Sequence, residues 1–419
     1  MSLAAEMDAK KSARTNLDAA AAGPGPVAVA VEAPRPSLRQ PELDALRGLL
    51  LVWMTLTHLP TGVSAWANQP FGFVSAAEGF VFLSAVLTGK LHGKLATRGD
   101  HSALRSKLWS RASRVYIYHL LLLAFAFTVG AALAHSGHRP ALHNLLDFYF
   151  DHPLVAMVSS LLLIYCPPLL DILPMYVIFL LLTPLLLLGA RRFGWGVMLF
   201  GSAGIWLWAQ FGLRLQLYLL LSRITGVHIP MQAMGAFNLY AWQFLWAAGV
   251  WLGAELWRGY NVMDRLPRWT GWAALAIVVA GACLRRDWPT GLFWDGSWNW
   301  LIDKWKLAPL RVVNFAAVGV VLWRLRHRLR AVLSRGPLPA LGMASIQVFT
   351  AHVVFVFLGL ALIYSDSDTL VHGWQARLLI ALSLLGLLTT GAVVARRKLR
   401  ERNERRLSAG LPVKEPQPL

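Results

Sequence analysis

Charged side chains are scarce in this sequence. They make up 15% of its 419 residues, whereas hydrophobic residues make up 56%. Soluble globular domains carry about 25% charged residues, so this composition excludes an ordinary soluble protein. The mean hydropathy of +0.51 points the same way. The sequence therefore predicts an all-α polytopic membrane protein that lies in a lipid bilayer.

Cysteine is equally scarce. The chain has Cys166 and Cys283, both in apolar stretches, and such a pair supports neither a disulfide framework nor a metal cluster. Four histidines gather in one polar segment: His135, His138, His143 and His152. Their spacing fits no tight zinc pattern, so we predict no metal site. The sequence also lacks a P-loop, a Gly-rich dinucleotide turn and a G-x-S-x-G motif, and we expect no permanently bound cofactor.

Acidic residues number 21 against 40 lysines and arginines, which gives a formal net charge of +19. The basic residues gather in short segments between apolar stretches, which is typical of the cytoplasmic loops of membrane proteins. We therefore expect no nucleic-acid partner. The apolar stretches predict about ten transmembrane helices, with both termini cytoplasmic. Their approximate ranges are 43–63, 72–91, 115–135, 169–190, 194–212, 239–257, 269–284, 308–324, 340–364 and 376–395.

The segments outside these ranges have their own compositions. Residues 1–40 are rich in Ala and Pro and predict a disordered cytoplasmic tail. Residues 41–396 would form the membrane domain, and residues 397–419 a basic cytoplasmic tail. The short apolar stretch 154–168 ends in two prolines and favours a re-entrant or interfacial segment. Four tryptophans crowd residues 288–300 of the predicted outer segment 285–307, and they either stack on sugar rings or belong to an aromatic belt: Trp288, Trp294, Trp298 and Trp300.

The first predicted span carries ionisable residues. Eleven positions separate Arg47 from His58, so both side chains share one helix face about 16 Å apart along the axis. Asp44 and Thr55 lie close to the same stripe. Ionisable groups are costly inside a membrane and usually mark a pathway or a site. Asp44 and Arg47 have an alternative role as topology anchors near the cytoplasmic headgroups.

Three further sets of polar residues lie in or beside predicted spans. Glu78 in the second span is geometrically able to contact His58 and would hold its tautomer; alternatively it is solvated at the outer interface. Arg111, Arg114 and His119 open the third span, where they would either receive phosphates of a nucleotide-like donor or anchor the topology. In the ninth span, His352 is either a second member of the site or a histidine satisfied by a neighbouring helix.

The order and spacing of several segments resemble the OpgC family of membrane acyltransferases, which is related to the acyltransferase-3 group with its Arg, ten residues and His in the first helix. The resemblance spans about residues 40–395. The matching segments are 43–48 with 58–60, 76–84, 114–119, 171–176, 237–243, 303–311 with Asn314-Phe315, and Val348-Phe349 with His352. The chain departs from the family pattern at Ala85, where Gly is common, and around 342–347, where the usual Asn and Pro are missing.

The resemblance implies an enzyme of the bacterial inner membrane. Such an enzyme moves an acyl group, typically succinyl, from cytoplasmic acyl-CoA (succinyl-CoA) to hydroxyls of osmoregulated periplasmic glucans. Arg47 and Asp44 would hold the donor together with Arg111, Arg114 and His119. His58 would act as a base or transient acyl carrier, oriented by Glu78. The acceptor side would comprise Asn238, Trp242, Gln243, Lys304, Arg311 and His352.

Two alternatives remain open from the residues. The nearer one is an acyltransferase that acts on another envelope polysaccharide or on a lipid. The other is a glucan exporter or secondary transporter, which predicts substrate flux without an acyl donor. The chain shows no internal repeat at the level of motifs, which weakly disfavours a transporter built from inverted repeats.

Overall fold

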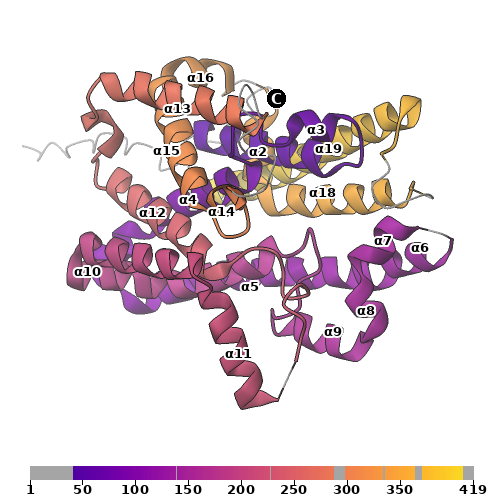
Figure 1. The fold of residues 1–419 in the computed structure, drawn as a ribbon. Helices are drawn as coiled ribbons and strands as arrows, with labels where there is room; N and C mark the ends of the chain where they lie inside the picture. Colours follow the sequence, from indigo (N-terminus) through magenta and orange to yellow (C-terminus); the bar gives the residue numbers. More distant parts are fainter. Residues whose placement is uncertain are drawn as a thin grey trace, which may run out of the picture. The chain divides into compact units, whose positions relative to one another are not determined.

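A computed structural model describes residues 41–137, 139–226, 228–286, 298–333, 336–363 and 370–408. These residues are mainly α-helical and contain no β-strand; Thr61 and Val371 form an isolated bridge. The elements in chain order (Figure 1) are α2 Pro41–His58, α3 Val63–Ala67, α4 Ala76–Arg98, α5 His101–Phe125, π-helical η1 Ala126–Gly130, α6 Ala131–His135, α7 Pro140–Leu145, α8 Asp147–Asp151, α9 Pro153–Leu161, α10 Ile172–Gln210, α11 Leu213–Thr225, α12 Leu239–Trp257, 3₁₀-helical η2 Val262–Arg265, α13 Trp269–Arg285, α14 Asn299–Ile302, α15 Pro309–Arg324, α16 Arg326–Leu333, α17 Leu338–Met343, α18 Ser345–Leu360 and α19 Gly373–Leu407.

Several helices are long and apolar enough to cross a membrane. Among the described residues, three meet this description in full: His101–His135, Ile172–Gln210 and Gly373–Leu407. Trp269–Arg285 and Ser345–Leu360 are shorter apolar helices. The expected all-α class is therefore confirmed at this level. The count of about ten spans and the cytoplasmic position of both termini stay predictions.

The helix α10 joins two of the predicted spans. The ranges 169–190 and 194–212 lie within or beside this one 39-residue element. Gly194, at φ 84° and ψ 157°, interrupts the helical backbone inside it. Glycine has no Cβ and therefore adopts a positive φ without a steric clash. The predicted boundary between these two spans is therefore a kink at Gly194 rather than a loop.

The predicted ninth span, 340–364, is wrong as a single helix. The chain forms the short helix α17, turns at Ala344 and continues as α18. The reason lies in contact with the first helix. A Cβ on Gly342 would lie 1.7 Å from the Asp44 carbonyl oxygen, and a Cβ on Gly48 would lie 2.2 Å from the Leu338 carbonyl oxygen. The backbones of α2 and α17 are thus in close contact at two glycines. This contact holds α17 against α2, so α17 and α18 do not form one continuous helix.

Other predicted boundaries shift or fall outside the described residues. The first span ends at His58, ahead of Pro60. Part of the polar segment that contains the four histidines forms α7 and α8. The predicted tail 1–40, His138, Trp288 and Trp294, and residues 409–419 of the predicted basic tail lie outside the described residues. The remaining start of that tail is helical, because α19 continues to Leu407.

The helices pack in pairs that are distant in sequence. Figure 1 shows α10 beside α5, and α18 beside α19. The helix α4 packs on α12, and α2 packs on both α17 and α4. One large apolar cluster links these helices, with Leu51, Val81, Trp242 and Val348 among its fully buried members. This packing pairs a polar side chain of α2 with one of α18, and a polar side chain of α4 with one of α15.

Candidate active site

Arg47 is held at the crossing of α2 with α17 and α18. Its side chain is 8% exposed. Nη1 donates to the Gly342 carbonyl oxygen at 3.4 Å and Nη2 to the Ser345 hydroxyl at 2.5 Å. The guanidinium carbon lies 5.7 Å from the centre of the Phe80 ring. Its Nε has no hydrogen-bond partner within the described part of the chain. A buried guanidinium with an unused donor is suited to bind an anionic ligand group.

His58, at the C-terminal end of α2, faces a second histidine. Its Nδ1 lies 3.2 Å from Nε2 of His352 on α18, with ring centres 5.3 Å apart. His58 is half-buried, whereas His352 is 1% exposed and packs edge-on against Phe349. Because Nδ1 of His58 is engaged, its Nε2 is the nitrogen left for other contacts. At this distance one ring donates its N–H to the lone pair of the other, and the tautomers determine which ring is the donor.

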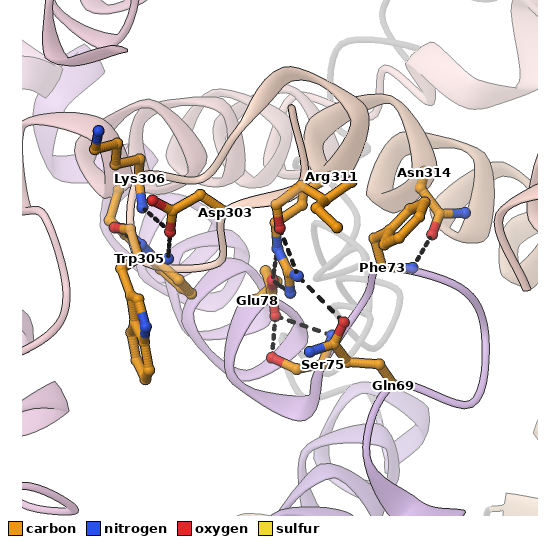
Figure 2. Close-up of polar contacts among 11 residues, drawn as sticks. Gln69, Phe73, Ser75, Glu78, Asp303, Trp305, Lys306, Arg311 and Asn314 are labelled. Carbon is orange, nitrogen blue, oxygen red and sulfur yellow. Dashed lines mark hydrogen bonds and ion pairs between the residues drawn. The ribbon is translucent and has the colours of Figure 1, made fainter. Parts of the chain in front are cut away.

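Glu78 has a different partner from the one expected. Its Oε1 accepts hydrogen bonds from Arg311, with the Arg311 Nε at 2.9 Å, and its Oε2 accepts from the Ser75 backbone N–H at 3.0 Å and from the Ser75 hydroxyl (Figure 2). Arg311 also donates to Gln69 Oε1 at 3.2 Å. The expected contact of Glu78 with His58 is therefore replaced by an ion pair. A fully buried carboxylate is better stabilised by a guanidinium than by a neutral imidazole.

Lys304 lies in the turn between α14 and α15, close to this ion pair. Its ammonium is 4.8 Å from the centre of the Trp305 ring. Burial lowers the pKa of Lys304, and the neighbouring charge of Glu78 offsets part of that shift. The Lys304 ammonium and the His58 imidazole are near enough to interact electrostatically. The structure thus brings a cation to the same end of the helices as His58 and His352.

Two residues predicted for the acceptor side, Asn238 and Trp242, hold the turn that carries Lys304. Asn238 caps α12, and its backbone N–H donates to the Trp305 carbonyl oxygen at 3.0 Å. The indole of Trp242, fully buried, donates to the same oxygen at 3.1 Å. Gln243 exchanges hydrogen bonds with Ser202 of α10 instead. All three side chains are engaged within the protein. Asn238 and Trp242 position the turn, whereas Gln243 joins α12 to α10.

Arg111 lies near Arg47. Its Nη1 donates to the Thr88 hydroxyl at 2.9 Å, and its Nη2 donates to the Tyr176 hydroxyl at 2.6 Å. The guanidinium groups of Arg47 and Arg111 are within electrostatic range of each other, as is Tyr176. The Asp44 carboxylate is also within electrostatic range of Arg47. The two guanidinium groups outnumber this one carboxylate, which agrees with a site for anionic groups.

The other predicted donor residues lie in different surroundings. Arg114 is exposed on α5, whereas His119, two turns farther along α5 than Arg111, is fully buried near the Tyr116 ring. Asp44 is buried on α2, and its backbone carbonyl forms the close contact with Gly342. The structure brings Arg47 and Arg111 together; it does not gather all five predicted donor residues.

Sequence reasoning missed the residues that hold these side chains. Thr88 and Tyr176 position Arg111, while Ser345 positions Arg47. One signal was available from the sequence alone. Ser75 and Glu78 have the S-x-x-E spacing of a capping box at the start of a helix, and the structure forms that capping box at α4. This spacing indicates a helix start at Ser75, but it does not indicate the ion-pair partner of Glu78.

Comparison with known proteins now decides the family. The model of the family described as OpgC protein matches residues 39–400. The chain belongs to the OpgC family. Comparisons with curated proteins and with solved structures gave no match. Membership in the OpgC family indicates an acyltransferase-like role in glucan modification, and together with the apolar helices it identifies a membrane protein.

Proposed function

We propose that this chain transfers an acyl group from acyl-CoA to a hydroxyl of a periplasmic glucan, with His58 as the base. The observation that carries the proposal is the contact of His58 with the buried His352, at the end of the helix that also carries the buried Arg47. OpgC family membership supports the glucan as acceptor. Succinyl-CoA as donor and the bacterial inner membrane as location are expectations from the same family.

The histidine pair favours a base at His58 Nε2. When Nδ1–H of His58 donates to Nε2 of His352, Nε2 of His58 holds a free lone pair. This lone pair removes the proton of the acceptor hydroxyl as its oxygen attacks the thioester carbonyl carbon. The resulting tetrahedral oxyanion expels the CoA thiolate, which takes the proton from His58. An alternative route makes His58 a transient acyl carrier, with Nε2 as the nucleophile.

Two cationic regions support the remaining steps. The Lys304 ammonium lies in electrostatic range of His58 and would stabilise the oxyanion of the tetrahedral intermediate. Arg47, three helix turns away, and Arg111 would bind phosphates of the donor. A separation of about 16 Å along α2 suits a donor whose phosphates and thioester lie at opposite ends of an extended arm.

The test is acyl transfer in proteoliposomes with labelled acyl-CoA and purified glucan. We expect His58→Ala to lower turnover by about 10²–10⁴-fold, as for loss of a general base. His101→Ala, an exposed histidine at the start of α5, is the matched control and should keep normal turnover. Normal turnover by a folded His58→Ala protein would remove the mechanism.

The role of Arg47 has a separate test. We expect Arg47→Ala to raise the KM for acyl-CoA while the KM for the glucan changes little. Arg397→Ala, an exposed arginine near the end of α19, serves as the control. An unchanged donor KM in Arg47→Ala would remove only the role assigned to this side chain.

A further inference from the structure

A cavity of about 180 Å³ lies between the start of α10 and one face of α11. Residues at positions 171, 174, 175 and 178 of the chain line it from the first side, and residues 214, 217, 218 and 221 line it from the second. Both sets follow the i, i+3, i+4, i+7 spacing of a single helix face. An apolar cavity of about 150 Å³ is able to hold a benzene-sized group, so this one has room for several carbon atoms.

The walls of the cavity are mainly apolar, and its polar groups are few. Met175 and Ile178 from α10 and Leu217 and Leu221 from α11 form opposite sides. Arg214 lies at the N-terminal end of the α11 face, in the same cavity. Such a combination, apolar walls with a single cation at one end, fits a ligand with a hydrocarbon chain and an anionic head.

The guanidinium of Arg214 is held in place but not fully used. Its Nη2 donates to three backbone carbonyls, with the Gly235 oxygen at 2.7 Å and the Met234 oxygen at 3.2 Å. Among the described residues, all hydrogen bonds of the Arg214 side chain come from Nη2. Its Nε and Nη1 therefore remain for a ligand. The Asp171 carboxylate also lines the cavity, but it accepts the Ala236 N–H at 3.1 Å and stands at the N-terminus of α10, where the helix dipole offsets its charge.

The cavity is continuous with an apolar outer surface. Leu221 lines the cavity and is also 55% exposed. Its neighbours on α11, Leu219, Leu220 and Ile224, are exposed too. α11 lies just after the predicted span 194–212, and an exposed apolar patch in a membrane protein is a site of membrane contact. A ligand would therefore reach the cavity from the bilayer, along α11.

We propose that this cavity binds a membrane phospholipid, with part of one acyl chain between α10 and α11 and the phosphate on Arg214. The lining of the cavity does not include His58, Arg47 or Lys304, and the test below measures lipid binding rather than acyl transfer. Free phosphate shares the anionic group but lacks the chain, and an experiment distinguishes the two.

The test is native mass spectrometry of the full chain released from nanodiscs made of phosphatidylglycerol. Leu217→Trp fills the cavity and should lower the fraction of protein that retains a lipid by about tenfold or more; Leu219→Trp, on the exposed face of α11, should retain lipid like the wild type. Arg214→Gln should weaken retention by at least about tenfold, the effect of a hydrogen bond to a charged group. Arg223→Gln, an exposed arginine of the same helix, should not.

Two outcomes would overturn the proposal. Retention that is equal in Leu217→Trp and Leu219→Trp would show that the lipid does not occupy the cavity. Displacement of the lipid by excess inorganic phosphate alone would show that the site binds the anion without the chain. Retention that falls in Leu217→Trp and Arg214→Gln, with both control variants and added phosphate without effect, would support it. Circular dichroism of each variant checks that it is folded.

Discussion

The buried ion pair between Glu78 and Arg311 gives the sharpest stability prediction. Both side chains are almost inaccessible, at 1% and 2% relative exposure. Removal of one partner leaves an uncompensated buried charge, which costs about 3–5 kcal/mol. We therefore expect Arg311→Leu and Glu78→Leu each to destabilise the protein by about that amount, and independent effects would sum to about 6–10 kcal/mol.

The double variant separates pairing from packing. In Glu78→Leu combined with Arg311→Leu, no charge stays unpaired, and an apolar replacement of a buried pair is often neutral. Ser75 and Gln69 lose partners, so a residual cost of about 1–3 kcal/mol is expected for unsatisfied polar groups. The double variant should thus be more stable than either single variant.

The assay is reversible unfolding in mixed micelles, followed by far-UV circular dichroism. Arg397→Leu is the matched control, because Arg397 pairs with Glu401 at 3.0 Å in an exposed i,i+4 arrangement, and such pairs contribute about 0–1 kcal/mol. Two results would refute the reasoning: single variants that are no less stable than Arg397→Leu, or single effects that add in the double variant.

Three further predictions follow from other contacts. Gly342→Ala should destabilise the protein by at least about 1–3 kcal/mol, as overpacking does, because the new Cβ would lie 1.7 Å from the Asp44 carbonyl oxygen. The control Gly319→Ala, with open space around its Cβ, should leave the unfolding midpoint unchanged or slightly higher. Equal midpoints for the two variants would contradict the close crossing of α2 and α17. His352→Gln should lower kcat about tenfold, the effect of one lost hydrogen bond, and shift the ¹⁵N resonances of the His58 ring; unchanged resonances would contradict the contact. Lys304→Gln should lower kcat with little effect on the KM for acyl-CoA if the ammonium stabilises the oxyanion; a change confined to that KM would assign Lys304 to the donor instead.

The sequence predicted the helices better than their partners. Runs of apolar residues located the longer helices, because a helix that packs in a bilayer must be apolar over most of its length. The spacing of Arg47 and His58 on one helix face also followed from the sequence. Periodicity says nothing about which helices become neighbours, however. Consecutive spans favoured Glu78 as the partner of His58, whereas the packing of α2 on α18 supplies His352, 294 positions away.

Contacts between helices that are distant in sequence explain the other differences between the predicted and the observed structure. The stretch 340–364 contains no proline after its start and reads as one helix. Its break at Ala344 depends on Gly342 meeting the backbone of α2, which is a tertiary contact that no local pattern records. Similarly, the pairing of Arg111 with Thr88 and Tyr176 joins three helices. The polar residues were visible in the sequence, but the packing of the helices determines which of them meet.

The proposed reaction of this chain is esterification of an external glucan through His58. The most direct measurement is mass spectrometry of the envelope glucans from a deletion strain that carries either the wild-type chain or His58→Gln. We predict that the wild type restores the acyl ester, and that His58→Gln leaves the glucan outside the cell but without the ester. Ester levels that His58→Gln restores in full, or glucan that fails to reach the outside in the deletion strain, would contradict the claim.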